Sequence, residues 1–219
     1  MVPLALELPA GRPLRLLGIG AHSDDLEIGC GGTARSLVRS HPDSSVLWWV
    51  VSGEPAREAE ARHAAEALLG KFCRLDFQAS GFRDGFLPWE GARVKEAFES
   101  LKQKFDPDLI LTHCRSDLHQ DHRLVGELTW NTWRDHLILE YEIPKYDGDL
   151  GRPNCYVPLE REDVEAKLAV LRSGFRSQQE KPWFREETFQ AMLRIRGVEC
   201  RSPSGFAEAF IAPKFTVRP

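Results

Sequence analysis

Two short segments of the sequence concentrate histidine and aspartate. The first is Ala21-His22-Ser23-Asp24-Asp25-Leu26-Glu27, and the second is His113-Cys114-Arg115-Ser116-Asp117-Leu118-His119-Gln120-Asp121-His122. Together they hold four of the seven histidines of the chain. Two imidazoles and one carboxylate in one place are enough for a three-ligand metal site with an open coordination position. The residue types therefore predict a metal centre, provided that the fold joins the two segments.

A metal held in this way would activate water. A divalent ion lowers the pKa of a bound water from about 15.7 to about 7 and polarises a substrate carbonyl. A carboxylate outside the ligand set can take the proton of the water, and a further histidine can stabilise an oxyanion or protonate a leaving amine. An extended turn cannot direct the adjacent Asp24 and Asp25 at the same metal, so we expect one ligand and one base.

The surrounding elements must bring the two segments together. Apolar runs predict buried strands, and helical spacing of apolar residues predicts helices between them. The predicted strands are residues 14–20, 45–52, 73–77 and 108–113, and the predicted helices are residues 31–40, 54–69 and 94–105. This alternation predicts right-handed βαβ units in a parallel sheet, with strand order 3-2-1-4. The first and fourth strands are then neighbours, and both polar segments lie at their carboxyl ends.

The rest of the chain continues the same pattern. A helix is predicted from Asp121 to about His136, then a long loop over 141–158, helices over 164–175 and 183–196, and a last strand over 206–211. We predict a single α/β domain with a Rossmann-like, doubly wound and mostly parallel sheet and helices on both faces. Its core would span residues 14–143, and residues 144–219 would form a C-terminal cap.

Composition narrows the class of protein. With 29 Lys and Arg against 33 Asp and Glu, the net charge is −4, which argues against a nucleic-acid or anionic-membrane binder. The longest apolar run, Val46–Val51, is far shorter than the roughly 20 residues of a membrane span. Residues 1–10 lack the basic start of a signal peptide. Five cysteines without a C-x-x-C pair predict no disulfide framework, and hence a cytoplasmic protein.

The polar segments resemble a known enzyme family. Residues 21–33, Ala-His-Ser-Asp-Asp-Leu-Glu-Ile-Gly-Cys-Gly-Gly-Thr, resemble the signature of the LmbE-like, or PIG-L-type, zinc-dependent N-acetylglucosaminyl deacetylases. That signature is usually Ala-His-Pro-Asp-Asp-x-Glu followed by Gly-Gly-Thr. Residues 119–122 resemble a second motif, usually His-Pro-Asp-His, and residues 82–85, Phe-Arg-Asp-Gly, a weaker third one. The resemblance covers about residues 14–136, with fainter similarity through residues 142–145 to the C-terminus.

The resemblance implies a metal centre made by His22, Asp25 and His122. The ion would be Zn²⁺, although Fe²⁺ or another divalent ion also suits two histidines and one aspartate. Asp24 would be the general base, with the alternative that it only caps a helix. Ser23 and Gln120 replace the prolines of the family, which affects loop stiffness rather than the ligand set.

The resemblance also assigns roles around this centre. His119 would act on the oxyanion or the leaving group, with Asp121 orienting or tuning it. Asp84 would bind sugar hydroxyls and Arg57 would contact the substrate. Their alternatives are a turn residue for Asp84 and a solvated helix ion pair for Arg57.

Two further residues lie beside the second motif. His113 ends a predicted strand, so we expect it behind the metal ligands, with a plain buried histidine as the alternative. Asp117 is expected to support a ligand by a hydrogen bond, with a turn residue as the alternative.

The implied activity is a metal-dependent hydrolysis that removes an acetyl group from an amino sugar or its conjugate. The partner is then a small N-acetylated sugar, and a homo-oligomer is consistent with the resemblance. One alternative is a nucleotide-binding Rossmann protein, because Gly18-Ile19-Gly20 begins a G-x-G-x-x-G pattern. The third glycine is absent, and Asp24 and Asp25 would repel a pyrophosphate. A non-catalytic sugar-binding relative is a further alternative, which predicts a lost ligand or base.

Overall fold

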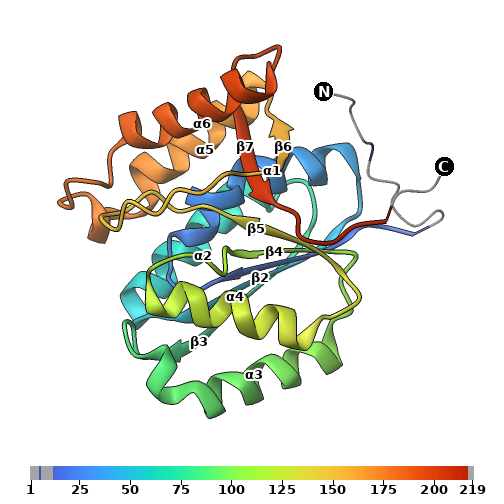
Figure 1. Ribbon diagram of the computed structural model, residues 1–219, viewed down its shortest axis with the longest axis vertical. Helices are drawn as coiled ribbons and strands as arrows, with labels where there is room; N and C mark the ends of the chain where they lie inside the picture. Colours follow the sequence, from blue (N-terminus) through green and yellow to red (C-terminus); the bar gives the residue numbers. More distant parts are fainter. Residues whose placement is uncertain (1–4, 6–11, 217–219) are drawn as a thin grey trace.

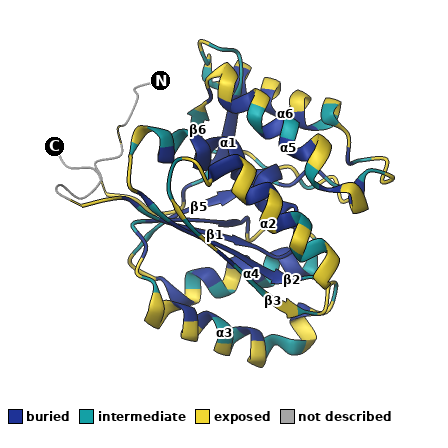
Figure 2. Cartoon of the chain, turned by 180° about the vertical axis from the view of Figure 1, so that it is seen from behind, coloured by how far each residue is buried: buried dark blue, intermediate teal, exposed yellow. Residues whose placement is uncertain are grey.

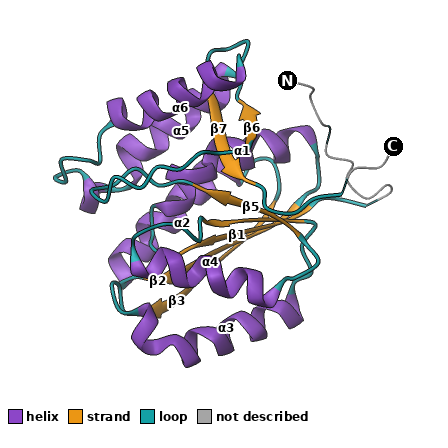
Figure 3. Cartoon of the chain, viewed as in Figure 1, coloured by secondary structure: helices purple, strands orange, loops and turns teal. Residues whose placement is uncertain are grey.

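A seven-stranded sheet runs between two layers of helices in the computed structural model, which describes residue 5 and residues 12–216 (Figures 1 and 3). The strand order within this part of the chain is β3-β2-β1-β4-β5-β7-β6. The strands are β1 (Arg15–Gly20), β2 (Ser45–Ser52), β3 (Arg74–Phe82), β4 (Leu109–His113), β5 (Leu137–Tyr141), β6 (Cys155–Pro158) and β7 (Ala207–Ile211).

Strands β1 to β5 pair in parallel, and β7 pairs antiparallel with both β5 and β6, so β7 alone among the described strands runs in the opposite direction. β1 pairs with β2 on one side and with β4 on the other, so the predicted order 3-2-1-4 is confirmed. The predicted α/β class and the doubly wound, mostly parallel sheet are confirmed as well. Since parallel strands end at the same edge, the segments after β1 and β4 meet there.

Helices cover both faces of the sheet, as Figure 2 shows by their buried inner and exposed outer surfaces. One face carries α1, α2, α5 and α6, and the other carries α3 and α4. The helices are α1 (Asp25–Ser40), α2 (Pro55–Leu69), α3 (Gly91–Lys104), α4 (Gln120–Thr132), α5 (Arg161–Gly174) and α6 (Glu186–Cys200), with short 3₁₀ turns η1 (Leu87–Glu90) and η2 (Arg176–Gln178). Because both faces are covered, the interior of β2 can be apolar at every position, and Val46–Val51 is buried.

The start of α1 and the end of β3 differ from the prediction. The first helix begins at Asp25 rather than at residue 31, so the whole Gly29-Cys30-Gly31-Gly32 stretch is helical. Burial against the sheet and the other helices of its layer outweighs the low helix propensity of these glycines. The third strand continues to Phe82 instead of ending at residue 77, because it pairs with β2 along nearly its full length.

The region after α4 differs more. The helix predicted to reach His136 ends at Thr132, and β5 follows at Leu137, where no strand was predicted. The predicted loop over 141–158 contains β6, which pairs only with β7 among the described strands. These short strands depend on partners far along the chain, so local periodicity does not reveal them. The last helix also begins and ends a few residues later than predicted, at Glu186 and Cys200.

The C-terminal elements hold α1 in place. The backbone N–H groups of Gly32 and Thr33 donate to the Glu208 carboxylate on β7 at 2.9 and 2.7 Å. Lys167 on α5 donates to Glu208 and to the Ile28 carbonyl, both at 2.6 Å. The buried lysine and glutamate therefore bind α1 through its backbone. They thereby fix the helix that begins with Asp25.

Within the described residues, none of the helices has the length and apolar character that crossing a membrane requires. The prediction about a signal peptide concerns residues 1–10, of which only Ala5 lies inside the described part of the chain.

Candidate active site

The two polar segments meet at the carboxyl ends of β1 and β4. The first forms the turn between β1 and α1, and the second connects β4 to α4. The Ala21 N–H donates to His113 Nε2 at 2.9 Å, which joins the end of β1 to the last residue of β4. Across this junction, His22 Nδ1 lies 3.0 Å from His122 Nε2.

The three candidate ligands lie close to one another. His22 Nδ1 lies 3.3 Å from Asp25 Oδ2, and His122 Nε2 lies 3.5 Å from Asp25 Oδ1. Tetrahedral zinc with bonds of about 2.0–2.1 Å separates its ligand atoms by about 3.3 Å. The separations of 3.0–3.5 Å, measured to different oxygens of Asp25, are close to this spacing. Two overlapping groups, His22 with His119 and His122, and Asp25 with His113 and His122, also bring their ligand atoms close enough together to hold a metal ion.

Carboxylates behind His22 and His122 determine which ring nitrogen of each histidine faces the other candidate ligands. His22 Nε2 lies 3.3 Å from Asp121 Oδ2 and 3.2 Å from Asp84 Oδ1, which leaves Nδ1 for a metal. His122 Nδ1 lies 3.0 Å from Asp117 Oδ2, which leaves Nε2. Such carboxylate–histidine pairs are typical of metal centres, because they fix the tautomer and the ring orientation.

His113 lies behind the cluster rather than in it. Its ring stacks on that of His122 with centroids 4.0 Å apart, and its Nε2 accepts the Ala21 N–H. That lone pair is therefore already used, although Asp25 Oδ2 lies 3.0 Å away. Burial and the neighbouring His122 lower the pKa of His113 to about 4, so the ring is neutral at pH 7.

The charges of the ligand cluster are strongly coupled. Burial opposes ionisation of Asp25, but the imidazoles of His122, His113 and His22 hold the pKa of this carboxyl well below its usual range. Burial also opposes charging of His22, yet Asp25 and Asp121 outweigh it and raise its pKa well above the ordinary value. The ionised carboxylate is the form of Asp25 that binds a metal.

Asp24 has the features of a general base. It occupies the N-cap position of α1, but its side chain makes no capping hydrogen bond within the described structure, so the helix-cap alternative does not use the carboxylate. Burial and the adjacent Asp25 raise the pKa of Asp24, while Arg57, whose Nη2 lies 3.6 Å from Asp24 Oδ1, opposes the rise. A raised pKa makes a carboxylate a stronger proton acceptor near neutral pH.

His119 lies at the start of α4 with one ring nitrogen already engaged. Its Nδ1 accepts the backbone N–H of Asp121 at 3.3 Å, so the neutral ring carries its proton on Nε2. Burial and the nearby His122 and His22 lower the pKa of His119, which favours this neutral form. Its ring centroid lies 4.9 Å from that of His22. The arrangement leaves an N–H donor beside the candidate ligands.

The carboxylate of Asp121 is directed at His22, whereas the sequence analysis paired it with His119. Besides His22, it accepts the backbone N–H groups of Gly85 at 2.7 Å and Leu87 at 3.1 Å. Asp121 therefore ties the loop after β3 to the histidine cluster. No signal in the local sequence indicates this contact, because the loop lies 34–36 residues away in the chain.

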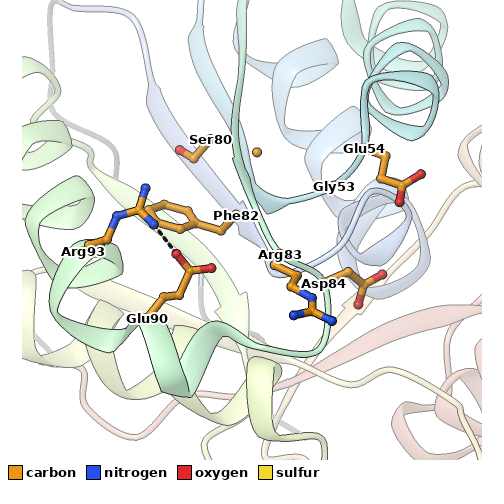
Figure 4. A pocket seen from close by; sticks show the side chains of 9 residues that line it. Gly53, Glu54, Ser80, Phe82, Arg83, Asp84, Glu90 and Arg93 are labelled. Atoms are coloured by element: carbon orange, nitrogen blue, oxygen red, sulfur yellow. Dashed lines mark hydrogen bonds and ion pairs between the residues drawn. The ribbon is translucent and has the colours of Figure 1, made fainter.

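Asp84 and Arg57 lie at the entrance to the cluster. Asp84 is 43% exposed and contacts both His22 and Arg57. A cavity of about 410 Å³ opens beside Asp84. Figure 4 shows it lined by polar and charged side chains, among them Glu54, Ser80, Arg83 and Arg93. Hence a ligand that reaches Asp84 from this cavity also approaches His22.

One residue near the site carried no predicted role. Lys145, in the loop after β5, donates to Asp117 Oδ2 at 3.0 Å. The sequence contained only a faint signal, the Glu142-Ile143-Pro144-Lys145 stretch, with nothing to connect it to Asp117.

Comparison with known proteins gives one family match and several solved structures with the same fold. The sequence profile of PIG-L, described as GlcNAc-PI de-N-acetylase, matches residues 17–133. No curated protein matches the chain in sequence.

Three solved structures share the fold. GalB, the 4-carboxy-2-hydroxymuconate hydratase of Pseudomonas putida, is 16% identical with a TM-score of 0.75, covering 94% of this chain and 98% of its own. The conserved protein TT1542 of Thermus thermophilus is 24% identical with a TM-score of 0.69, covering 94% and 97%. The N,N'-diacetylchitobiose deacetylase of Pyrococcus horikoshii is 18% identical with a TM-score of 0.62, covering 90% and 83%.

Proposed function

Since the chain belongs to the PIG-L (GlcNAc-PI de-N-acetylase) family, we propose that it is a metal-dependent hydrolase that removes an acetyl group from an N-acetylated amino sugar or its conjugate. The family match covers more than half of the chain and includes both polar segments. The proposal depends most on one observation. His22 Nδ1 lies 3.0 Å from His122 Nε2, and each of these nitrogens lies 3.3–3.5 Å from one of the two Asp25 oxygens. The adjacent Asp24 carboxylate makes no capping hydrogen bond.

The donor set supports zinc as the resident metal. Two imidazoles and one carboxylate that leave a coordination position open are typical of catalytic zinc, and they also accept Fe²⁺. A divalent ion bound there would polarise an amide carbonyl and acidify water. Asp121 and Asp117 contact the outer ring nitrogens of His22 and His122, so Nδ1 of His22 and Nε2 of His122 are the atoms directed at a metal.

The remaining steps belong to side chains around that centre. Asp24 would take the proton from the attacking water, because its carboxylate is buried, free of capping bonds and more basic than an ordinary aspartate. The Nε2–H of His119 would donate a hydrogen bond to the oxyanion formed on the amide carbon. The proton that Asp24 has taken from the water would then pass to the leaving nitrogen, so that the C–N bond breaks to give acetate and a free amine.

The substrate assignment is based on the polar residues around Asp84 and on the solved structures that share the fold. Asp84 and the polar cavity beside it offer acceptors and donors for sugar hydroxyls, with Arg57 holding Asp84 in place. One structural neighbour is a deacetylase of N,N'-diacetylchitobiose, which is an N-acetylated amino-sugar disaccharide. These observations favour a small carbohydrate over a nucleotide, since Asp24 and Asp25 would repel a phosphate at the start of α1.

Metal binding is the first test. Chelator-stripped wild type is titrated with zinc in a calorimeter beside His122→Ala and the matched control His136→Ala, a histidine paired with Asp106 away from the site. We expect one tight site in the wild type and in His136→Ala, and a large loss in His122→Ala. Equal binding in all three proteins would refute the metal centre.

Catalysis is tested separately, by acetate release from N-acetyl sugars and their conjugates. Asp24→Asn should lower the turnover by about 10²–10⁴-fold, the usual contribution of a general base. Asp76→Asn, which changes an exposed aspartate on β3, should leave it unaffected. Tight zinc binding without acetate release from any N-acetyl sugar would instead favour another water-addition reaction, such as the hydration performed by the structural neighbour GalB.

A further inference from the structure

A buried lysine lies directly behind one candidate metal ligand. Lys145 Nζ donates to Asp117 Oδ2 at 3.0 Å and to both oxygens of Asp149 at 2.7 and 2.6 Å. The side chains of Lys145, Asp117 and Asp149 are only 8%, 4% and 7% exposed. An ion-paired cluster this deeply buried restricts the conformations of both loops that supply it.

The same carboxylates hold the segment from which the second motif begins. Asp117 Oδ1 accepts the backbone N–H of His119 at 2.8 Å, and Asp149 Oδ2 accepts that of Leu118 at 2.7 Å. Lys145 bridges the two carboxylates, so the loop after β5 is joined to the loop between β4 and α4. The position of α4, which carries His122, depends on this junction.

The bridge also bears on the tautomer of His122. Asp117 Oδ2 lies 3.0 Å from both Lys145 Nζ and His122 Nδ1. Lys145 therefore holds the Asp117 carboxylate in the position from which it contacts His122 Nδ1. The other ring nitrogen, Nε2, then faces His22 and Asp25.

We propose that Lys145, anchored by Asp149, is a positioning residue that fixes Asp117 and thereby makes His122 present Nε2 to the metal. The inference rests on the metal centre of the proposed function. It extends that function to a loop outside both sequence motifs. The lysine contacts neither metal nor substrate, and it acts only through Asp117.

The test uses Lys145→Met, which removes the charge at similar volume, together with Lys145→Arg and Asp149→Asn. Zinc affinity is measured by competition with a coloured chelator. The ¹⁵N resonances of the His122 ring are recorded in the metal-free protein to report the tautomer. Loss of a residue behind a metal ligand typically lowers the affinity by about 10–100-fold. We expect Lys145→Met to lose about tenfold at least and to shift the His122 proton away from Nδ1, and Lys145→Arg to restore both in part.

Arg196→Met is the matched control. Arg196 binds Glu142 at 2.8 and 3.0 Å, near the start of the same loop, without touching Asp117. It should leave zinc affinity and the ring resonances unchanged. If Lys145→Met does not fold, Asp149→Asn is used in its place, and we expect a smaller change of zinc affinity and ring resonances in the same direction.

Wild-type behaviour of the variants in both measurements would overturn the proposal. So would an equal loss in Arg196→Met, because the effect would then come from general loosening of the loop. Failure of the proposed function is a different result: zinc affinity and tautomer respond to Lys145, but no N-acetyl sugar is hydrolysed.

Discussion

Glu27 gives a quantitative test of how the structure changes the chemistry of a motif residue. It lies on α1, 1% exposed, where Trp48 Nε1 donates to Glu27 Oε1 at 2.9 Å. Among the described residues, Glu27 Oε2 has no hydrogen-bond partner. Burial, opposed by Trp48 and aided by Asp24 and Asp25, raises the pKa of Glu27 from 4.5 to about 8. At pH 7 the folded protein therefore holds this side chain as a neutral acid.

The sign of the stability effect follows from proton binding. Between pH 4.5 and about 8 the folded state binds a proton at Glu27 that the unfolded state has lost. The free energy of unfolding therefore falls by about 1.4 kcal/mol for each pH unit in this interval, and by about 5 kcal/mol across it. Glu27→Gln keeps an acceptor for Trp48 but cannot ionise. Its stability relative to wild type should rise by about 3 kcal/mol between pH 4.5 and pH 7 and level off above pH 8.

Urea unfolding of both proteins at several pH values between 4.5 and 9 measures this difference. Taking the difference between variant and wild type removes the contribution of other titrating groups. Glu66→Gln, which changes an exposed glutamate on α2, is the control and should give a flat difference. A flat difference for Glu27→Gln as well would refute the argument that burial keeps this acid neutral.

Three further results are expected. Arg57 lowers the pKa of Asp24, so Arg57→Ala should move the acidic limb of the kcat/KM profile to higher pH. In Gly29→Ala the new methyl group would lie 2.2 Å from the Tyr141 ring, and urea unfolding should show a loss of about 1–3 kcal/mol. Lys167→Met would leave Glu208 buried without its cation and should lower the free energy of unfolding by about 3–5 kcal/mol.

Each of these results has its own control. Gly91→Ala introduces a methyl group into open space at the start of α3, so it should not destabilise the protein. Arg172→Met removes an exposed pair with Glu186 and should cost less than about 1 kcal/mol, in contrast to Lys167→Met. An acidic limb that stays in place in Arg57→Ala would contradict the assignment of Asp24 as the base.

The sequence by itself determined the core of the fold and the membership of the cluster. Strands such as Ser45–Ser52 are encoded by continuous apolar residues, because a strand covered on both faces must be apolar at every position. The strand order 3-2-1-4, common in doubly wound sheets, then predicts β1 beside β4, which brings His22 and His122 together. Local composition and one topological rule were therefore sufficient for these features.

Only the tertiary structure decided which side chains contact one another within the cluster. The Asp121 carboxylate contacts His22, whereas His119 contacts only the backbone N–H of Asp121. Lys145 reaches Asp117 from a loop 28 residues away, and burial raises the pKa of Glu27 to about 8. The short strand β5 likewise forms by pairing along its full length with β4, and β6 forms by pairing with β7 near the end of the chain. Hydrogen-bond partners, tautomers and desolvation depend on groups that are distant in sequence, so no local pattern of residues encodes them.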